Sequence, residues 1–273
     1  MFNLNFGNIQ PSFLILGVQK GGTTSLHNYL LQHSKLISPE IKELHFFDTN
    51  KDYKLENYIK QFPKRFLKNK LSFEATPRYL YYPKVAEKIF NYNSKMKFII
   101  LIRDPVKRAY SAYNMYKQFQ DNISMLKFFR QIEIENSNEQ IYSILYKGKF
   151  PSFQEYVDFE LENSNNNLIE PSIIKRGYYF DQIQEYLKYF KLEQFLFIDS
   201  DNLKTDTLQE LNRVSRFLNI KNFDDLFLDL SLKHKRTYES KLDGEFYNNL
   251  LEHYKLKNKG LKELTSLNFK WLE

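Results

Sequence analysis

The segment FLILGVQKGGTT, residues 13–24, places a glycine-rich turn directly after a short apolar run. The run Phe13–Leu16 is typical of a buried strand, and the residues after the glycines follow a helical pattern. Such a turn presents backbone N–H groups and the positive end of a helix dipole to an anion. It predicts either an anion site or a tight structural turn, and the hydroxyls of Thr23, Thr24 and Ser25 favour the anion site.

The turn nearly matches the pattern G-x-x-x-x-G-K-[ST] of ATP- and GTP-binding loops. In those loops a lysine reaches the β- and γ-phosphates, but Thr23 stands at the position of that lysine. The nearby basic residue is Lys20, three positions earlier in the turn. The sequence therefore disfavours ATP, and Lys20 is suited to a ligand that ends one group beyond a 5'-phosphate.

Four short apolar runs, each followed by a helical pattern, indicate an α/β chain. Strands are expected at Phe13–Leu16, Lys70–Phe73, Phe98–Ile102 and Phe195–Ile198, and helices at Thr24–Gln32, Pro83–Asn91, Pro105–Gln118 and Thr205–Leu218. Aromatic residues at helical spacing predict another helix between Tyr179 and Phe190. The alternation implies an open, mostly parallel sheet with helices on both faces. We expect one domain over residues 1–273.

Composition limits the cellular compartments and the classes of binding partner that we expect for this protein. Lysine and arginine outnumber acidic residues 40 to 33, and the resulting charge of +7 indicates either anionic partners or a mildly basic solvated surface. The chain has no cysteine, which excludes disulfides and thiol catalysis. It shows no secretory leader, no apolar run of about 18 residues and no dense basic stripe. We expect a cytoplasmic protein with no transmembrane segment and no nucleic-acid partner.

A second candidate anion site follows the strand that ends at Ile102. Arg103 stands where open α/β sheets bind ligands, and its guanidinium suits a phosphate. Ser111 lies eight residues later, on the helix expected from Pro105. The alternative is that Arg103 and Asp104 pair with each other or cap the turn.

The loop GVQKGGTTSL resembles the 5'-phosphosulfate loop of sulfotransferases that use 3'-phosphoadenosine 5'-phosphosulfate (PAPS), especially heparan-sulfate-type and bacterial carbohydrate enzymes. The resemblance implies a P-loop-containing, sulfotransferase-like fold, with PAPS as donor, 3',5'-adenosine bisphosphate as product and no metal. It is weakest at residues 121–172, where we expect acceptor specificity to be determined. The implied cofactor-binding residues are Gln19, Lys20, Gly21, Gly22, Thr23, Thr24, Ser25, Arg103, Ser111, Lys235, Arg236, Thr237 and Tyr238.

Two of these assignments depend on the resemblance more than on the residues. In the family, the arginine and serine at the positions of Arg103 and Ser111 bind the 3'-phosphate of PAPS, which ATP lacks. Residues 235–238 match a family loop that closes over the cofactor phosphates. By composition alone, residues 235–238 are typical of a solvated surface.

The segment PEIKELHFFD, residues 39–48, matches the family pattern K-E-x-H-F-F-D. The resemblance implies that Glu43 is the catalytic base, that Lys20 stabilises the leaving group, and that His45 positions groups or carries a proton. It places Lys42 and Asp48 on the substrate side. Without it, Glu43 is typical of a surface acid and His45 of a structural histidine. If the segment is extended, Glu43, His45 and Phe47 share one side.

A departure from the family pattern follows the second predicted strand. Heparan-type enzymes commonly carry Glu-Lys-Thr-Pro, whereas this chain has Glu74-Ala75-Thr76-Pro77. Because the missing lysine is a substrate-side group, a heparan-like polyanionic acceptor fits less well, and Arg78 is the candidate replacement. We expect sulfuryl transfer to a hydroxyl or amine of a carbohydrate; the alternatives are a small-molecule alcohol as acceptor, or a P-loop kinase.

Overall fold

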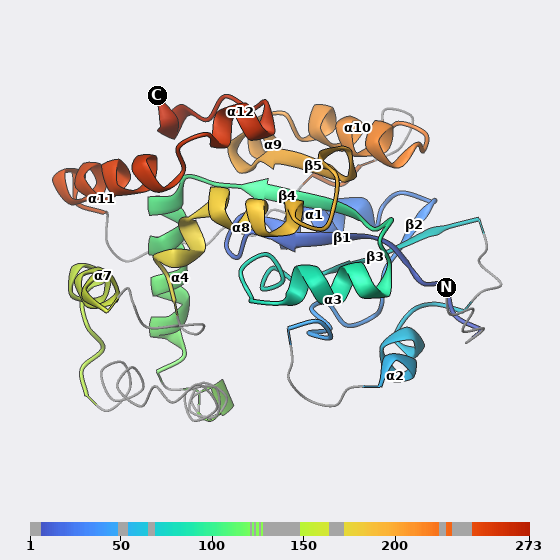
Figure 1. The fold of residues 1–273 in the computed structure, drawn as a ribbon, viewed down its shortest axis with the longest axis horizontal. Helices are drawn as coiled ribbons and strands as arrows, with labels where there is room; N and C mark the ends of the chain where they lie inside the picture. Colours follow the sequence, from blue (N-terminus) through green and yellow to red (C-terminus); the bar gives the residue numbers. More distant parts are fainter. Residues whose placement is uncertain are drawn as a thin grey trace. The chain divides into compact units, whose positions relative to one another are not determined.

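The computed structural model describes residues 7–48, 54–64, 69–120, 122, 124–125, 127, 148–163, 172–223, 228–230 and 242–273 (Figure 1). The chain divides into two compact units. The first comprises Met1–Arg103, Asp181–Arg236 and Lys262–Phe269, and the second comprises Asp104–Phe180, Thr237–Leu261 and Lys270–Glu273. The single domain expected over residues 1–273 stays a prediction.

The first unit contains a parallel sheet with the strand order β2-β3-β1-β4-β5 (Figure 1). Its strands are β1 (Pro11–Gly17), β2 (Leu36–Ile37), β3 (Leu71–Ala75), β4 (Lys97–Ile102) and β5 (Phe195–Asp199). The four strands predicted from the sequence are confirmed, and the short edge strand β2 was not predicted. Because β1 pairs in parallel with both β3 and β4, the carboxyl ends of these strands meet at one edge of the sheet.

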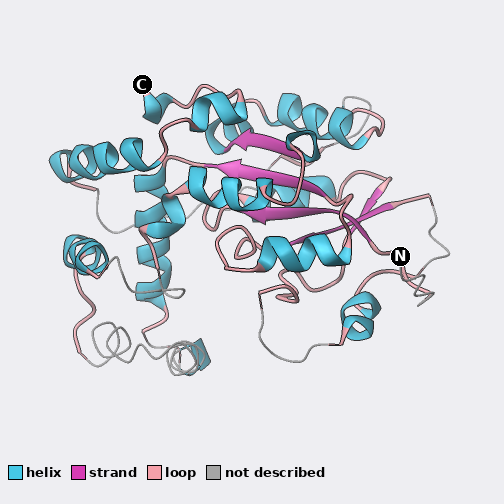
Figure 2. Ribbon diagram, viewed as in Figure 1, coloured by secondary structure: helices cyan, strands magenta, loops and turns pink. Residues whose placement is uncertain are grey.

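Helices cover both faces of this sheet, as the alternation of strands and helices predicted (Figure 2). The first unit holds α1 (Thr23–Leu30), α2 (Leu55–Lys60), α3 (Val85–Tyr92), η3 (Leu192–Gln194), α9 (Ser200–Thr205) and α10 (Thr207–Leu218). Two further helices, α8 (Tyr179–Leu187) and α12 (Leu261–Thr265), have residues in both units. The helix predicted between Tyr179 and Phe190 is thus confirmed as α8.

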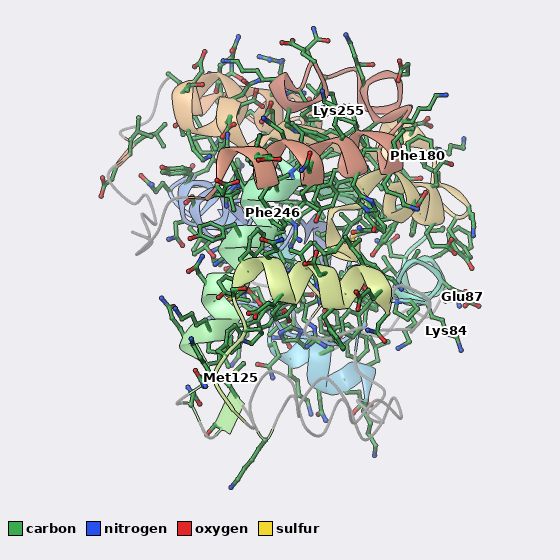
Figure 3. The ribbon with its side chains drawn as sticks, turned by 90° about the vertical axis from the view of Figure 1, so that its left-hand side faces the viewer. Lys84, Glu87, Met125, Phe180, Phe246 and Lys255 are labelled. Atoms are coloured by element: carbon green, nitrogen blue, oxygen red, sulfur yellow. The ribbon has the colours of Figure 1, made fainter. Side chains whose placement is uncertain are left out.

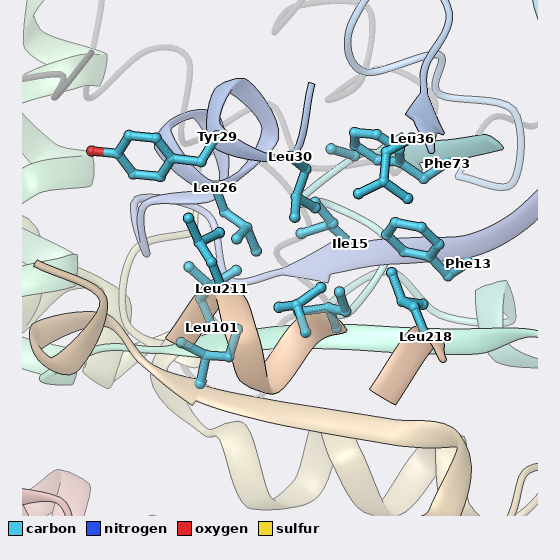
Figure 4. Close-up of a cluster of buried hydrophobic side chains, with 14 of the residues drawn as sticks. Phe13, Ile15, Leu26, Tyr29, Leu30, Leu36, Phe73, Leu101, Leu211 and Leu218 are labelled. Atoms are coloured by element: carbon cyan, nitrogen blue, oxygen red, sulfur yellow. The ribbon is translucent and has the colours of Figure 1, made fainter. Parts of the chain in front are cut away.

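Alternating strand residues supply the two halves of the core. On one face, Leu26 of α1 and Leu211 of α10 pack with Ile15 of β1 in a cluster of buried side chains (Figure 4). On the other face, the ring of Tyr186 from α8 lies 5.6 Å from the ring of Phe98 in β4. The sheet is therefore buried on both faces. This packing fixes the positions of the strands, and with them the carboxyl ends that carry the candidate site.

The second unit is helical in its described part. Its elements are α4 (Pro105–Gln118), α7 (Phe153–Glu162), η2 (Lys175–Gly177), α11 (Gly244–Lys257) and η5 (Lys270–Leu272). The bounds predicted for α4 are confirmed. The helix starts at Pro105 because Asp104 caps it and because a proline in the first turn needs no N–H partner. Phe246 of α11 is labelled in Figure 3. Its ring lies 5.7 Å from that of Phe153 in α7.

Two helix starts differ from the sequence expectation. The helix expected from Pro83 begins two residues later, because Lys84 takes the left-handed conformation at the N-cap, with φ 62°. The helix expected over Thr205–Leu218 is interrupted at Asp206, whose side chain accepts a hydrogen bond from the Gln209 N–H at 3.3 Å. A capping aspartate ends α9 and starts α10 because it satisfies first-turn N–H groups.

Candidate functional site

The turn between β1 and α1 is arranged to receive an anion. Gly22 caps α1 in the left-handed conformation, with φ 101°. The N–H groups of the first helical turn, those of Thr23, Thr24 and Ser25, have no acceptor inside the helix. Thr23 is buried, whereas Thr24 and Ser25 are half-buried. The backbone thus offers donors for a phosphate next to two accessible hydroxyls.

Short backbone contacts fix the shape of this turn. The Gly21 N–H donates to the Val18 carbonyl at 2.8 Å, and the Val18 N–H donates to the Leu101 carbonyl of β4 at 3.0 Å. A Cβ atom at Gly21 would lie 2.8 Å from Val18 Cγ2, so a side chain cannot be accommodated without displacing the turn. The Ser200 hydroxyl donates to the Gly21 carbonyl at 2.6 Å. Sequence analysis missed Ser200, although it directly follows β5 at the same edge of the sheet.

The two cations expected to meet the cofactor come together at this turn. Lys20 has φ 68°, and its carbonyl accepts a hydrogen bond from Arg103 Nη1 at 2.8 Å. Arg103 directly follows β4, and Lys20, Arg103 and Gln19 are all half-buried. Asp104 caps α4 instead, accepting from the Lys107 N–H at 3.0 Å, as the capping alternative predicted. The Arg103 guanidinium is therefore bonded to the backbone of the turn, to which Lys20 itself belongs.

The remaining predicted cofactor residues do not lie in the described part of the first unit. Ser111 lies on α4 in the second unit, where 2% of it is exposed. Lys235, Arg236, Thr237 and Tyr238 lie outside the described residues. Their cofactor-binding roles stay predictions.

Of the six residues predicted for catalysis and the substrate side, all but Lys20 form one chain of contacts in the first unit. Lys42 Nζ bonds to Glu43 Oε1, and Glu43 Oε2 lies 3.8 Å from His45 Nε2. His45 Nδ1 lies 2.8 Å from Asp48 Oδ2, which also lies 3.3 Å from Arg78 Nε. Because the Asp48 carboxylate accepts a hydrogen bond from Nδ1, His45 Nε2 is directed at Glu43. A carboxylate and an imidazole can therefore share a proton-transfer task here.

Exposure separates these residues into accessible and supporting groups. The side chains of Glu43 and His45 are 38% and 36% exposed, whereas those of Asp48 and Arg78 are 1% and 13% exposed. Arg78 also bonds to the Tyr82 hydroxyl and stacks on its ring, 4.2 Å from the centroid. Asp48 contacts both His45 and Arg78. The substrate-side roles expected for Asp48 and Arg78 stay predictions.

The segment 39–48 is not extended at Glu43 and His45, so the condition under which Glu43, His45 and Phe47 share one side is not met. Glu43 and His45 both take left-handed backbone conformations, with φ 66° and 53°. The ring of Phe46 stacks on Tyr58 at 4.2 Å, and the ring of Phe47 meets Tyr58 at 5.4 Å. The two phenylalanines thus join one aromatic cluster, where an extended chain would send them to opposite sides.

His27 of α1, which sequence analysis did not single out, connects the anion turn to the start of this segment. Its Nε2 lies 3.1 Å from the Ser38 hydroxyl oxygen. Burial lowers the pKa of His27 below its ordinary value of 6.5; the nearby Lys42 acts in the same direction. The imidazole is therefore held neutral between the two predicted binding regions.

The lowered pKa of His27 predicts a loss of stability in mild acid. Between the folded and unfolded pKa values the unfolded chain binds more protons, so this contribution is complete above 6.5 and is lost as the pH falls through the folded pKa. We expect a lower melting temperature at about pH 5.5 than at about pH 7.5, measured by circular dichroism. The decrease should be smaller in His27→Gln. An equal decrease in both proteins would exclude His27 as its source; His253, whose pKa burial also lowers, accounts for a residual slope.

Two features of the described residues bear on the kinase alternative. Within the described ranges, no group of three or more His, Cys, Asp or Glu side chains could hold a metal ion. Asp199, the strand-end acid that a kinase would use for a metal, caps α9 by accepting from the Asp201 N–H at 2.8 Å. Among the helices of the described residues, none is long and apolar enough to cross a membrane.

Comparisons with known proteins agree with the resemblance. Residues 10–263 match the sulfotransferase domain family. Heparan sulfate glucosamine 3-O-sulfotransferase 5 of Mus musculus is 29% identical over 216 residues, covering 77% of this chain and 54% of that protein. Membrane-associated sulfotransferase kil1 of Dictyostelium discoideum is 24% identical over 315 residues, covering 96% and 66%. The chain spans about half the length of the heparan sulfate relative.

Solved structures show the same fold. A sulfotransferase from Alicyclobacillus acidocaldarius matches with a TM-score of 0.69 at 22% identity, covering 97% of this chain and 100% of that chain. A mouse sulfotransferase complexed with PAP matches with a TM-score of 0.54 at 13% identity, covering 95% and 89%. The open α/β architecture predicted from the sequence is confirmed.

Proposed function

The chain belongs to the sulfotransferase domain family, and on that premise we propose that it transfers the sulfuryl group of PAPS to a hydroxyl or amine of a carbohydrate. The observation that carries the proposal is the turn after β1, where Arg103 holds the carbonyl of Lys20. A guanidinium bonded to this turn, a lysine within it and the first-turn N–H groups suit a ligand with several phosphates. With Thr23 in place of the usual lysine, the turn suits a 5'-phosphosulfate better than a triphosphate.

The accessible groups fit an in-line displacement. The acceptor oxygen or nitrogen forms a bond to sulfur, while the bond from sulfur to the bridging oxygen of the donor breaks. Glu43 takes the proton of the acceptor, with His45 as its neighbour, and Lys20 stabilises the negative charge that develops on the leaving phosphate. Each of these three side chains is at least partly accessible, so each can reach a bound ligand.

Charge pairing on the acceptor side favours an uncharged saccharide over a polyanion. Lys42 is paired with Glu43, Arg78 is paired with Asp48, and Lys88 Nζ donates to a backbone carbonyl of the same segment. These cations already have partners in the described part of the first unit. Recognition of a sulfated chain would require breaking such pairs, which costs part of the binding free energy. A small-molecule alcohol is the alternative acceptor.

Thermal-shift titration tests the donor. We expect 3',5'-adenosine bisphosphate to raise the melting temperature by roughly 5–10 °C at about 100 times its dissociation constant. ATP with Mg²⁺ should produce a smaller shift, because the lysine of the triphosphate loop is missing. An oligonucleotide serves as the control for nonspecific attraction to a basic chain. A larger shift with ATP and Mg²⁺ than with the bisphosphate would favour the kinase alternative.

The cytoplasmic location stays a prediction.

A further inference from the structure

The turn that carries the proposed base is strained and needs external anchors. Glu43 and His45 both have positive φ, a conformation that costs non-glycine residues free energy. Such residues persist where the surrounding structure over-determines them. The groups that hold the backbone directly after His45 therefore decide how Glu43 and His45 are presented.

One anchor is the hydroxyl of Tyr79, from the connection between β3 and α3. The Phe46 N–H donates to this hydroxyl at 2.9 Å, and the hydroxyl donates to Glu74 Oε1 at 2.7 Å. A backbone N–H can only donate, so an oxygen lone pair of the hydroxyl faces the Phe46 N–H and the hydroxyl proton is directed at Glu74. Glu74 thereby fixes the direction in which Tyr79 acts.

The Glu74 carboxylate is itself immobilised in the core. It is 2% exposed and accepts hydrogen bonds from the Tyr58 hydroxyl at 2.5 Å and the Thr76 hydroxyl at 2.7 Å, besides that of Tyr79. Burial raises its pKa, and the three hydroxyl donors oppose this shift by stabilising the ionised form. Glu74 belongs to β3, so the position of the Tyr79 hydroxyl is fixed relative to the sheet.

From these contacts we infer that Tyr79, oriented by Glu74, is a positioning residue that holds the Glu43–His45 turn in its reactive conformation through the N–H of Phe46. The inference rests on the proposed function. A second contact acts on the same segment, since Lys88 Nζ donates to the Phe47 carbonyl at 3.0 Å. The backbone after His45 is thus held at an N–H and at a carbonyl.

Two isosteric variants separate positioning from burial. Tyr79→Phe removes the hydroxyl that accepts from Phe46, and Tyr58→Phe removes a hydroxyl that bonds to the other oxygen of Glu74. Both tyrosines are fully buried and both contact Glu74, so the loss of a buried hydroxyl is matched. Each variant is assayed for amide hydrogen exchange at Phe46, for kcat and for the KM of PAPS.

We expect Tyr79→Phe to speed exchange at Phe46 by about tenfold or more, because an anchoring hydrogen bond is lost. Its kcat should fall about ten- to hundredfold with the KM of PAPS unchanged, since small displacements of reacting groups cost rate rather than donor binding. Tyr58→Phe should change exchange at Phe46 and kcat by less than about threefold, the effect of a weak indirect contact.

Exchange or kcat that is equal in the two variants would overturn the inference. If the wild-type protein transfers no sulfuryl group, the proposed function fails, while the exchange comparison still judges the Tyr79 anchor. If Tyr79→Phe does not fold, Glu74→Gln takes its place under the same criteria, because it keeps the Tyr79 ring and hydroxyl and weakens the acceptor that orients this hydroxyl; the Tyr58 contact that it also weakens is controlled by Tyr58→Phe.

Discussion

Replacing Glu43 with glutamine is expected to lower kcat by about 10²- to 10⁴-fold, the usual contribution of a positioned general base. Glutamine keeps the size of the side chain but cannot accept the acceptor's proton. Glu43 is 38% exposed, bonded to Lys42 and 3.8 Å from His45, so it can reach a bound acceptor while remaining oriented. Initial rates with saturating PAPS measure the loss.

The matched control for this variant is Glu40→Gln, which removes the same charge from an exposed position three residues earlier. Its kcat should stay close to that of the wild type. Affinity for 3',5'-adenosine bisphosphate, measured by titration calorimetry, should be unchanged in both variants because neither residue lies at the turn after β1. Near-normal turnover in Glu43→Gln would remove Glu43 as the base and leave His45 as the candidate.

Replacing Lys20 with alanine is expected to lower kcat by about 10²- to 10³-fold, the usual effect of removing one group that stabilises developing charge. The carbonyl of Lys20, and not its side chain, receives the Arg103 hydrogen bond, so the turn should keep its shape. The loss should therefore appear mainly in kcat, with a smaller change in affinity for the bisphosphate.

Lys204→Ala controls for the loss of one positive charge. Lys204 is 57% exposed in its side chain and pairs with Asp201 on α9. This variant should keep wild-type kcat. If Lys20→Ala loses donor affinity and keeps kcat, Lys20 binds the ground state and does not act on the leaving group.

The sheet and the anion turn could be predicted because their signals are local. Short apolar runs bounded by turns identified β1, β3, β4 and β5, and glycines after β1 identified the turn. The edge strand β2 is only two residues long, too short for a periodic pattern. The start of α3 depends on the left-handed conformation of Lys84, which residue type does not favour.

The sequence predicts which residues form the acceptor side, but not the backbone conformation that brings them together. The resemblance identified Lys42, Glu43, His45 and Asp48, and Arg78 was the candidate replacement for the missing family lysine. The structure brings these five into one chain of contacts. Glu43 and His45 are non-glycine residues with positive φ, which departs from the extended geometry that would place their side chains on one side. No local sequence pattern indicates this backbone conformation.

Transfer of labelled sulfate from PAPS tests the proposed reaction most directly. The acceptors are neutral oligosaccharides, a sulfated oligosaccharide of matched length and small alcohols, each assayed with wild-type protein and with Glu43→Gln. We expect label on a neutral saccharide, less on the sulfated one, and little on either with the variant. Absence of transfer from PAPS to every acceptor, with transfer of phosphate from ATP to the same panel, would contradict the assignment.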